Sequence, residues 1–259
     1  MTRRPSATLP LAAALALVLA ACGGNPPSPT LTDPNAIVTA ALDSTAAATS
    51  VHLEFTLDGA ATVELPIGGG AAAPIDLTGA TASADIDLAG SAASATFGVP
   101  AVFNFSGALT SVDGWVYVKT SLTGPLYQKS AGAAAALDPG AAKRMILGLR
   151  GLLDTEGLVL VKGADVACGG VQCYTVTTDL TSAQLGTDGT GALDGLPINL
   201  AGASLQLTIR VEQPAPNHLA GITAVVAFPS SPPLTIEMTA SKWDELVSIV
   251  PPPPDQVAP

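Results

Sequence analysis

SVHLEFTLDG, residues 50–59, is the stretch that decides how we expect this chain to fold. Apolar side chains at every second position from Val51 to Leu57 alternate with polar ones. This period of two is typical of a strand with one buried face. Asp58-Gly59 then supplies a turn, and a second strand is predicted near residues 61–67. The chain is therefore expected to build an antiparallel sheet with one apolar face.

The residues before this stretch predict a helix over 33–49. Asp33 is a favourable N-cap, and Pro34 suits the first helical turn. Apolar residues then recur at helical spacing and form one face; they are Ile37, Val38, Ala41, Leu42 and Thr45. This helix is expected to lead directly into the first strand.

The remainder of the chain repeats the strand pattern, with short connections that contain Gly, Pro, Asp or Asn. Such connections favour antiparallel neighbours over crossover units. The further strands we expect are 76–88, 101–109, 112–120, 158–165, 173–180, 203–212, 219–228 and 234–241. A second helix is predicted after Asp138-Pro139, and its apolar stripe consists of Met145, Ile146, Leu149, Leu152 and Leu153.

These elements predict an α+β fold: a single strongly curved antiparallel sheet, or half-barrel, lidded by a few helices and enclosing an apolar cavity. A sheet of this many strands must curl, and its apolar face must be covered. The few predicted helices favour a cleft over a solid core, although a large core would also explain the apolar composition.

The N-terminus reads as an export signal. Arg3 and Arg4 precede an apolar run from Leu9 to Ala21 that is too short to span a bilayer. The ending Leu19-Ala20-Ala21-Cys22 looks like a bacterial lipobox, in which the cysteine takes a diacylglyceryl group before cleavage. An ordinary cleaved signal with a coincidental cysteine is the alternative. The sequence leaves open whether Cys22 carries two or three acyl chains.

The predicted organisation is a lipoprotein signal peptide over 1–21, a Pro-rich linker from lipidated Cys22 over 22–32, a lipid-binding domain over 33–250 and a disordered Pro-rich tail over 251–259. Removing Arg3 and Arg4 with the signal takes the formal charge from −11 to −13. Because such an acidic surface repels phosphate groups, nucleic acid is not an expected partner. The expected location is the outer face of the cell membrane, held by the lipid anchor.

Cys168 and Cys173 flank a four-residue turn. In an exported protein the expected state is oxidised, and the turn brings the two Cα atoms within disulfide reach. The alternative, a zinc site, needs about four ligands, and no other cysteine or histidine lies nearby in the sequence. We therefore predict a structural disulfide and no metal or cofactor.

Four stretches of the sequence resemble lipoproteins of mycobacteria. They are the lipobox with its linker, AATSVHLEF (47–55), VDGWVYVK (112–119), and the end of the chain from LTIEM (234–238) through Lys242-Trp243 to VPP (250–252). The chain resembles the family of the lipoarabinomannan-carrier and phthiocerol-dimycocerosate-transport lipoproteins, whose fold is similar to the periplasmic lipoprotein carriers. The resemblance contains no catalytic motif, and the cysteine pair and the Ala/Gly-rich region 68–98 depart from the family.

This resemblance implies a half-barrel whose concave side takes the acyl chains of a lipid or glycolipid, for transport or chaperoning across the cell envelope. The candidate lining residues are Leu53, Phe55, Phe103, Phe105, Val116, Val118, Met145, Ile146, Leu149, Leu207, Ile209 and Val225. Each could instead be ordinary core. Periodicity leaves open whether Val116 and Val118, or Trp115 and Tyr117, face the cavity. A membrane transporter is a further partner to consider, and we expect a monomer.

Two other classes of function remain as alternatives. The first is a structural or interaction lipoprotein with a solid core and no lipid cargo. The second is a hydrolase with a polar cluster around His52 or His218. We expect no enzyme, because both histidines are predicted at polar surface positions and no nucleophile motif accompanies them.

Overall fold

A computed structural model of the chain describes residues 30–64, 72–132, 150–151, 153, 157–185, 202–229 and 231–259. Residues 31–259 form one compact unit, and all of its described apolar core clusters lie within that unit. We therefore expect this unit to fold without the residues that precede it. Cys22, most of the linker, and the predicted helix with Met145, Ile146 and Leu149 lie outside the described residues.

The predicted first helix is confirmed as α2, Pro34–Ala47. The side chain of Asp33 accepts a hydrogen bond from the backbone N–H of Asn35 at 3.1 Å and so caps the helix. All five residues of the predicted apolar face are buried. The chain becomes extended at Ala48 and enters strand β1 at Ser50.

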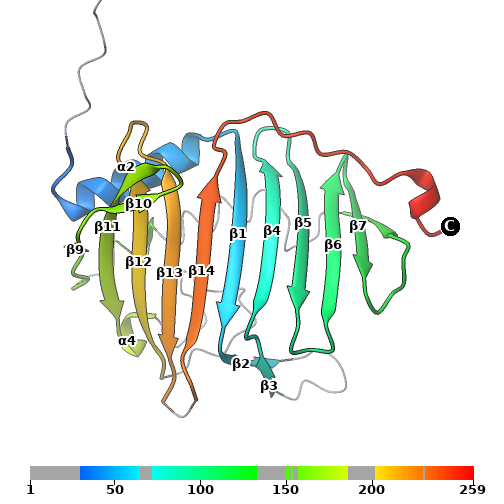
Figure 1. The fold of residues 1–259 in the computed structure, drawn as a ribbon, viewed down its shortest axis with the longest axis horizontal. Coiled ribbons are helices and arrows are strands. Elements are labelled where there is room, and N and C mark those ends of the chain that lie inside the picture. The colour runs from blue at the N-terminus through cyan, green and yellow to red at the C-terminus, as the bar shows by residue number, and fades with distance from the viewer. Residues whose placement is uncertain are drawn as a thin grey trace, which may run out of the picture. The chain divides into compact units, whose positions relative to one another are not determined.

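Twelve strands form one antiparallel sheet in the order β10-β11-β12-β13-β14-β1-β4-β5-β6-β7-β8, with β9 paired to β11 (Figure 1). Their bounds are β1 Ser50–Asp58, β4 Ala80–Asp87, β5 Ala92–Val99, β6 Phe105–Val112, β7 Trp115–Thr120, β8 Gln128–Ala131, β9 Val161–Lys162, β10 Val166–Cys168, β11 Val171–Leu180, β12 Ser204–Glu212, β13 Leu219–Ala227 and β14 Leu234–Ser241. The last strand pairs with the first, so β14 and β1 lie in the middle of the sheet. Smaller elements are the hairpin of β2 Ala60–Glu64 and β3 Ala72–Asp76, helix α4 Ser182–Leu185, and the 3₁₀ turn Pro254–Gln256.

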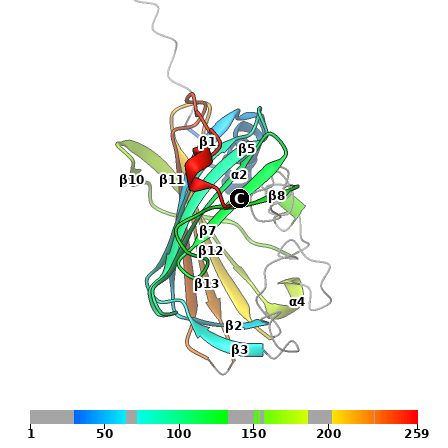
Figure 2. The ribbon, with the colours of Figure 1, turned by 90° about the vertical axis from the view of Figure 1, so that its right-hand side faces the viewer.

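The sheet is strongly curved and does not close on itself, which confirms the predicted half-barrel of class α+β (Figure 2). Helix α2 lies across one face of the sheet, packed against β11, β12 and β13. We call this the inner face and the opposite one the outer face. Strand register assigns each side chain to a face, because pairs directly opposite each other in neighbouring strands point to the same side.

The inner face of β11–β14 and the buried face of α2 form the main core, which we call the closed half. Its buried residues are between 0% and 7% exposed. Ile37 and Leu42 of α2 contribute to it beside Ile209 and Leu234. Large aliphatic side chains fill the space between helix and sheet, as in a close-packed interior.

Several predicted strand boundaries are wrong, because turns divide the predicted segments. The predicted strand 76–88 is two strands in the structure: β3 ends at Asp76 and β4 begins at Ala80. A tight turn separates them, in which Gly79 has a φ of +73°. The predicted strand 112–120 is split by Asp113-Gly114, the β6–β7 turn. The predicted strand 101–109 begins only at Phe105, since residues 100–104 form a turn. Strand β5 was not among the predicted strands.

The end of the chain also differs from the prediction of an extended tail without core residues. Tyr127 and Val257 form a parallel bridge, and the N–H of Ala258 donates to the carbonyl of Tyr127 at 2.8 Å. Val257 and Ile249 pack on a small outer-face cluster that includes Tyr117. The proline-rich segment therefore packs on the domain. It does so because the backbone of Tyr127, just before β8, is not paired with a neighbouring strand and bonds to Gln256 and Ala258 instead.

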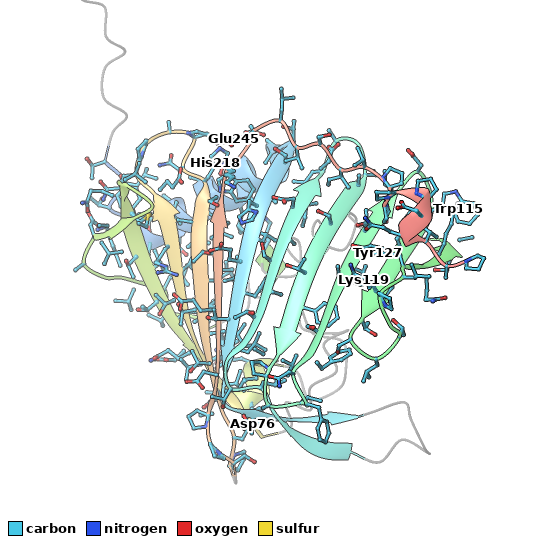
Figure 3. The ribbon with its side chains drawn as sticks, turned by 45° about the vertical axis from the view of Figure 1, so that its right-hand side comes forward. Asp76, Trp115, Lys119, Tyr127, His218 and Glu245 are labelled. Carbon is cyan, nitrogen blue, oxygen red and sulfur yellow. A yellow bond between two sulfur atoms is a disulfide. The ribbon has the colours of Figure 1, made fainter. Side chains whose placement is uncertain are left out.

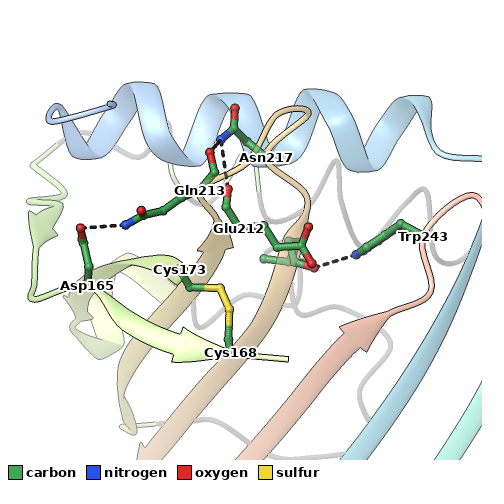
Figure 4. Close-up of a disulfide and its surroundings, with 8 residues drawn as sticks. Asp165, Cys168, Cys173, Glu212, Gln213, Asn217 and Trp243 are labelled. Atoms are coloured by element: carbon green, nitrogen blue, oxygen red, sulfur yellow. Dashed lines mark hydrogen bonds between the residues drawn. A yellow bond between two sulfur atoms is a disulfide. The ribbon is translucent and has the colours of Figure 1, made fainter. Parts of the chain in front are cut away.

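The predicted disulfide joins Cys168 and Cys173, whose Cα atoms are 6.0 Å apart (Figure 4). It closes the hairpin of β10 and β11 at one edge of the sheet. Nearby, Asp165 accepts hydrogen bonds from Lys162 and Gln213 at 2.6 and 2.7 Å. These bonds, the one from Lys162 foremost, hold the pKa of the Asp165 carboxyl below its usual value.

Candidate functional site

The inner face continues from the closed half onto β1, β4, β5, β6 and β7, a region that we call the open half. Register aligns its residues in rows that cross the strands. One row is Leu53, Ala84, Ala95, Leu109 and Val118. The next is Phe55, Ala82, Phe97, Gly107 and Thr120. Both rows are almost wholly apolar, so this half of the inner face offers a broad apolar surface.

Small side chains occupy the middle of both rows, where the closed half carries leucine, isoleucine and valine. Ala82 lies between Phe55 and Phe97, and the adjacent pair Ala84 and Ala95 lies between Leu53 and Leu109. Most larger residues of the open half, among them Phe55 and Phe97, are only half-buried. From these side-chain sizes we infer a shallow depression along the alanines, and half-buried apolar side chains beside it are available for contact.

Two aromatic rings of β5 and β6 lie close together on this surface. The rings of Phe97 and Phe105 are 5.5 Å apart between centroids and tilted by 50°, a favourable arrangement. The Phe97 ring lies over Gly107, where an added Cβ would come within 2.4 Å of it. Glycine at position 107 is therefore what allows the ring to lie flat on the sheet.

Register resolves which residues of β7 face inward. Val116 and Val118 pair with Ser111 and Leu109 and lie on the inner face. Trp115 (Figure 3) therefore lies on the outer face, and the Lys129 ammonium lies 4.0 Å from the centroid of its ring. Periodicity left two alternatives open for β7. In the structure, Val116 and Val118 face inward, and Trp115 and Tyr117 face outward.

Five of the predicted lining residues lie on the open half of the inner face: Leu53, Phe55, Phe105, Val116 and Val118. Four others lie elsewhere. Leu207 and Ile209 are in the closed core, 4% and 1% exposed. Val225 pairs with Gln206 and Thr235 and so points to the outer face, and Phe103 is 97% exposed in a turn. The remaining three, Met145, Ile146 and Leu149, lie outside the described residues.

Sequence reasoning missed several residues of the open half, namely Ala82, Ala84, Ala95, Phe97, Gly107 and Leu109. A signal was present in β5, where Ala93, Ala95, Phe97 and Val99 alternate with small polar or glycine residues. The alternation is weak because alanine and glycine carry little hydrophobic contrast. For the same reason, the alternation of alanine with small polar residues in β4 gives only a weak strand signal in the sequence.

Most charged groups of the sheet lie on its outer face; Lys162 of the edge strand β9, the register partner of Val176, is an exception. The Nδ1 atom of His52 lies 2.7 Å from Asp85 Oδ1, and its Nε2 lies 3.6 Å from Glu54 Oε1. Arg210 donates to Glu237 at 3.0 Å. Within the part of the chain that the structure describes, no Ser or Cys side chain is hydrogen-bonded to either histidine, and no group of His, Cys, Asp and Glu could hold a metal ion.

His218 lies at the junction of α2, β13 and the segment after β14 (Figure 3). It is buried, stacks on Trp243 at 5.0 Å and lies 3.7 Å from Asp244. Asp244 accepts hydrogen bonds from the backbone N–H and hydroxyl of Thr49 at 2.7 and 2.9 Å. The backbone N–H, then the hydroxyl, holds the pKa of Asp244 below its usual value, with a smaller effect of His218. This arrangement joins the residue before β1 to the segment that follows β14.

Two open hollows of about 430 and 520 Å³ lie over β1–β4–β5 and β5–β6–β7. Most of the residues that line them carry outer-face side chains, including Thr81, Ser83, Thr96 and Lys119. Both hollows are open, and their outer-face side chains are mostly hydroxyl-bearing or charged, whereas the inner-face rows are almost wholly apolar. The apolar rows of the open half remain the candidate site.

Comparison with solved structures finds two mycobacterial proteins of similar fold. LprF from Mycobacterium bovis has a TM-score of 0.58 and 17% identity, over 86% of this chain and 98% of LprF. The lipoprotein LppX from Mycobacterium tuberculosis has a TM-score of 0.51 and 20% identity, over 85% of this chain and 100% of LppX. At these identities the likeness concerns the fold, and it confirms at that level the resemblance predicted from the sequence.

No protein-family model matches the sequence, and no curated protein matches it. In the described part of the chain, no helix is long and apolar enough to cross a membrane.

Proposed function

We propose that this protein is a membrane-anchored lipoprotein that binds the acyl chains of a lipid or glycolipid on the open half of its inner face and carries or chaperones that lipid in the cell envelope. The observation that carries the proposal is the pair of apolar rows across β1 and β4–β7. They join small residues to half-buried aromatic and aliphatic ones over five adjacent strands.

Acyl chains need a surface of this kind. Burial of each methylene contributes about 0.8 kcal/mol, and a long chain therefore gains more from an extended apolar strip than from a small pocket. The rows contain few polar groups that a chain would desolvate, Thr120 being the polar member of the second row. The same fold occurs in the lipoprotein LppX, which supports a similar role.

The anchor follows from the sequence signal that ends at Cys22. Two or more acyl chains on that residue would hold the protein stably at a bilayer, where one chain would not. The proline-rich residues 24–30 would serve as an extended tether between the bilayer and the domain. The proposed location is the outer face of the cell membrane.

The test is native mass spectrometry of residues 31–259, expressed without the anchor and followed by lipid extraction. We expect a stoichiometric lipid adduct. Ala82→Trp fills the middle of the second row and should lower occupancy about tenfold or more, since it replaces the depression by an indole ring. Thr81→Trp is the matched control, because the neighbouring Thr81 is exposed on the outer face of the same strand.

An adduct that persists in Ala82→Trp would mean that the lipid binds elsewhere. A clean mass for the unmodified domain, unchanged after incubation with envelope lipids, would contradict the proposal. It would favour a structural lipoprotein without cargo.

A further inference from the structure

Two loops project side by side from one end of the open half. They are residues 100–104, between β5 and β6, and residues 121–127, between β7 and β8; with the strand residues that flank them they span 99–105 and 120–127. The N–H of Ser121 donates to the carbonyl of Ser106 at 2.8 Å, and the N–H of Ser106 donates to the hydroxyl of Ser121 at 3.2 Å. These bonds fix the two loops beside each other; we call them the loop pair.

The loop pair exposes two large apolar side chains. Phe103 is 97% exposed and Leu122 is 80% exposed. Phe103 and Asn104 both have left-handed backbone, with φ of 51° and 54°. This conformation is unfavourable for a bulky residue, so the turn holds the Phe103 ring in solvent at a cost in stability.

The turn around Phe103 is nevertheless ordered by its own hydrogen bonds. The N–H of Asn104 donates to the carbonyl of Pro100 at 3.1 Å, and that of Phe105 donates to the carbonyl of Val102 at 2.8 Å. The exposed ring is therefore a built feature of the structure.

The loop pair carries no charge. Neither 99–105 nor 120–127 contains Asp, Glu, Lys, Arg or His, in a chain with 21 acidic residues. The charged residue at its border is basic: Lys119 ends its side chain 4.6 Å above the ring of Tyr127 (Figure 3). Proteins that contact a bilayer commonly place apolar side chains in the lipid and aromatic and basic side chains at the level of the headgroups. The loop pair, with its apolar tips and the neighbouring lysine and tyrosine, matches this arrangement.

We propose that the loop pair inserts Phe103 and Leu122 into the surface of a lipid bilayer, with Lys119 and Tyr127 at the level of the headgroups. The absence of carboxylates removes the repulsion that the rest of this acidic surface would have for anionic lipids. Two loop tips offer too little area for a stable protein–protein interface but suffice for shallow insertion.

The position of the loop pair links it to the lipid site. Val99 and Phe105, which flank the first loop, are register partners on the inner face. A bilayer in contact with the loop pair would therefore lie at the ends of the strands, beside the second apolar row, so that an acyl chain could pass between bilayer and sheet. This role in lipid exchange rests on the proposed function, whereas insertion itself does not.

The test uses residues 31–259 and vesicles of phosphatidylcholine with phosphatidylglycerol, some containing doxyl-labelled phosphatidylcholine. Phe103→Trp should show a blue-shifted emission with vesicles and quenching by the doxyl lipid, beyond the signal of the native tryptophans. Leu246→Trp is the matched control, because Leu246 is 106% exposed in the segment after β14, which runs along the end of the sheet opposite the β5–β6 loop (Figure 1). It should show neither change.

In co-sedimentation with the same vesicles, the double variant Phe103→Asp/Leu122→Asp should have an affinity for the vesicles that is lower by about tenfold or more, since two apolar contacts are lost. Leu246→Asp should bind as the unmodified domain does. No vesicle binding by the unmodified domain, or equal losses in both variants, would overturn the proposal.

Native mass spectrometry of the same proteins separates the two proposals. Bound lipid together with absent insertion would overturn the loop-pair proposal and leave the proposed function standing. Insertion through Phe103 without any bound lipid would support the loop pair and contradict the carrier function.

Discussion

The closed and open halves of the inner face belong to one continuous sheet with the same alternation, yet they differ in what fills them. In the closed half, large aliphatic residues such as Ile209 and Leu234 meet α2 and are almost completely buried. In the open half, Ala82 lies between the half-buried Phe55 and Phe97, and the pair Ala84 and Ala95 lies between the half-buried Leu53 and Leu109. The comparison teaches that side-chain size and packing against a helix such as α2, rather than topology, can decide which part of a curved sheet becomes tightly packed core.

The largest expected difference between the halves is in core truncation. Ile209→Ala should lower the free energy of unfolding by about 2–5 kcal/mol, because Ile209 is 1% exposed and leaves a cavity. Leu109→Ala, in the open half, should cost about 1 kcal/mol because its side chain is only half-buried. Urea denaturation of both variants measures the difference. Equal losses would mean that the open half is packed as tightly as the closed half.

The aromatic end of the open half can be disturbed by a single methyl group. Gly107→Ala would bring a Cβ to 2.4 Å from the Phe97 ring and 2.8 Å from the carbonyl of Lys119, so we expect a cost of about 1–3 kcal/mol and weaker lipid binding. Gly98→Ala is the matched control, because its nearest contact would be Thr81 Oγ1 at 3.8 Å. Thermal unfolding and lipid occupancy should change in the first variant much more than in the second.

The disulfide belongs to the edge of the closed half. Replacing both Cys168 and Cys173 by serine should lower stability by about 2 kcal/mol, as expected for a short closed loop. Lipid occupancy at the open half should stay unchanged in native mass spectrometry. Loss of lipid in this variant would show that the two halves are coupled.

The smallest expected effect concerns the junction at Asp244. The pKa of its carboxyl in the folded protein lies below the ordinary 3.8, so its bonds to Thr49 stabilise the fold above that pH and are lost as the pH falls through the folded pKa. Asp244→Asn should therefore lower Tm at neutral pH and converge with the unmodified protein in acid. A constant difference in Tm across that range would contradict this role of the carboxylate.

The sequence predicted the sheet, α2 and the disulfide because each rests on a local signal. Strong alternation marks β1, an Asp-Pro cap marks α2, and spacing marks the cysteine pair. It placed strand ends wrongly where a turn such as 100–104 lacks a marked break in the apolar pattern.

The candidate site was predicted less completely for two physical reasons. Alanine and glycine in β4–β6 carry weak periodicity, although they shape the depression. Long-range register decides the face of each strand, and it places Val225 on the outer face and Val116 on the inner one. Burial by α2 likewise assigns Ile209 to the core, a contact that no local pattern reveals.

The central claim is that acyl chains lie on the open half of the inner face. The most direct measurement is photo-cross-linking of residues 31–259 with a fatty acid that carries a diazirine on its chain, followed by peptide mapping. The account predicts adducts on inner-face residues of β1 and β4–β7, such as Phe97, Leu109 and Val118. Adducts confined to the outer face, or to the closed half beneath α2, would contradict it.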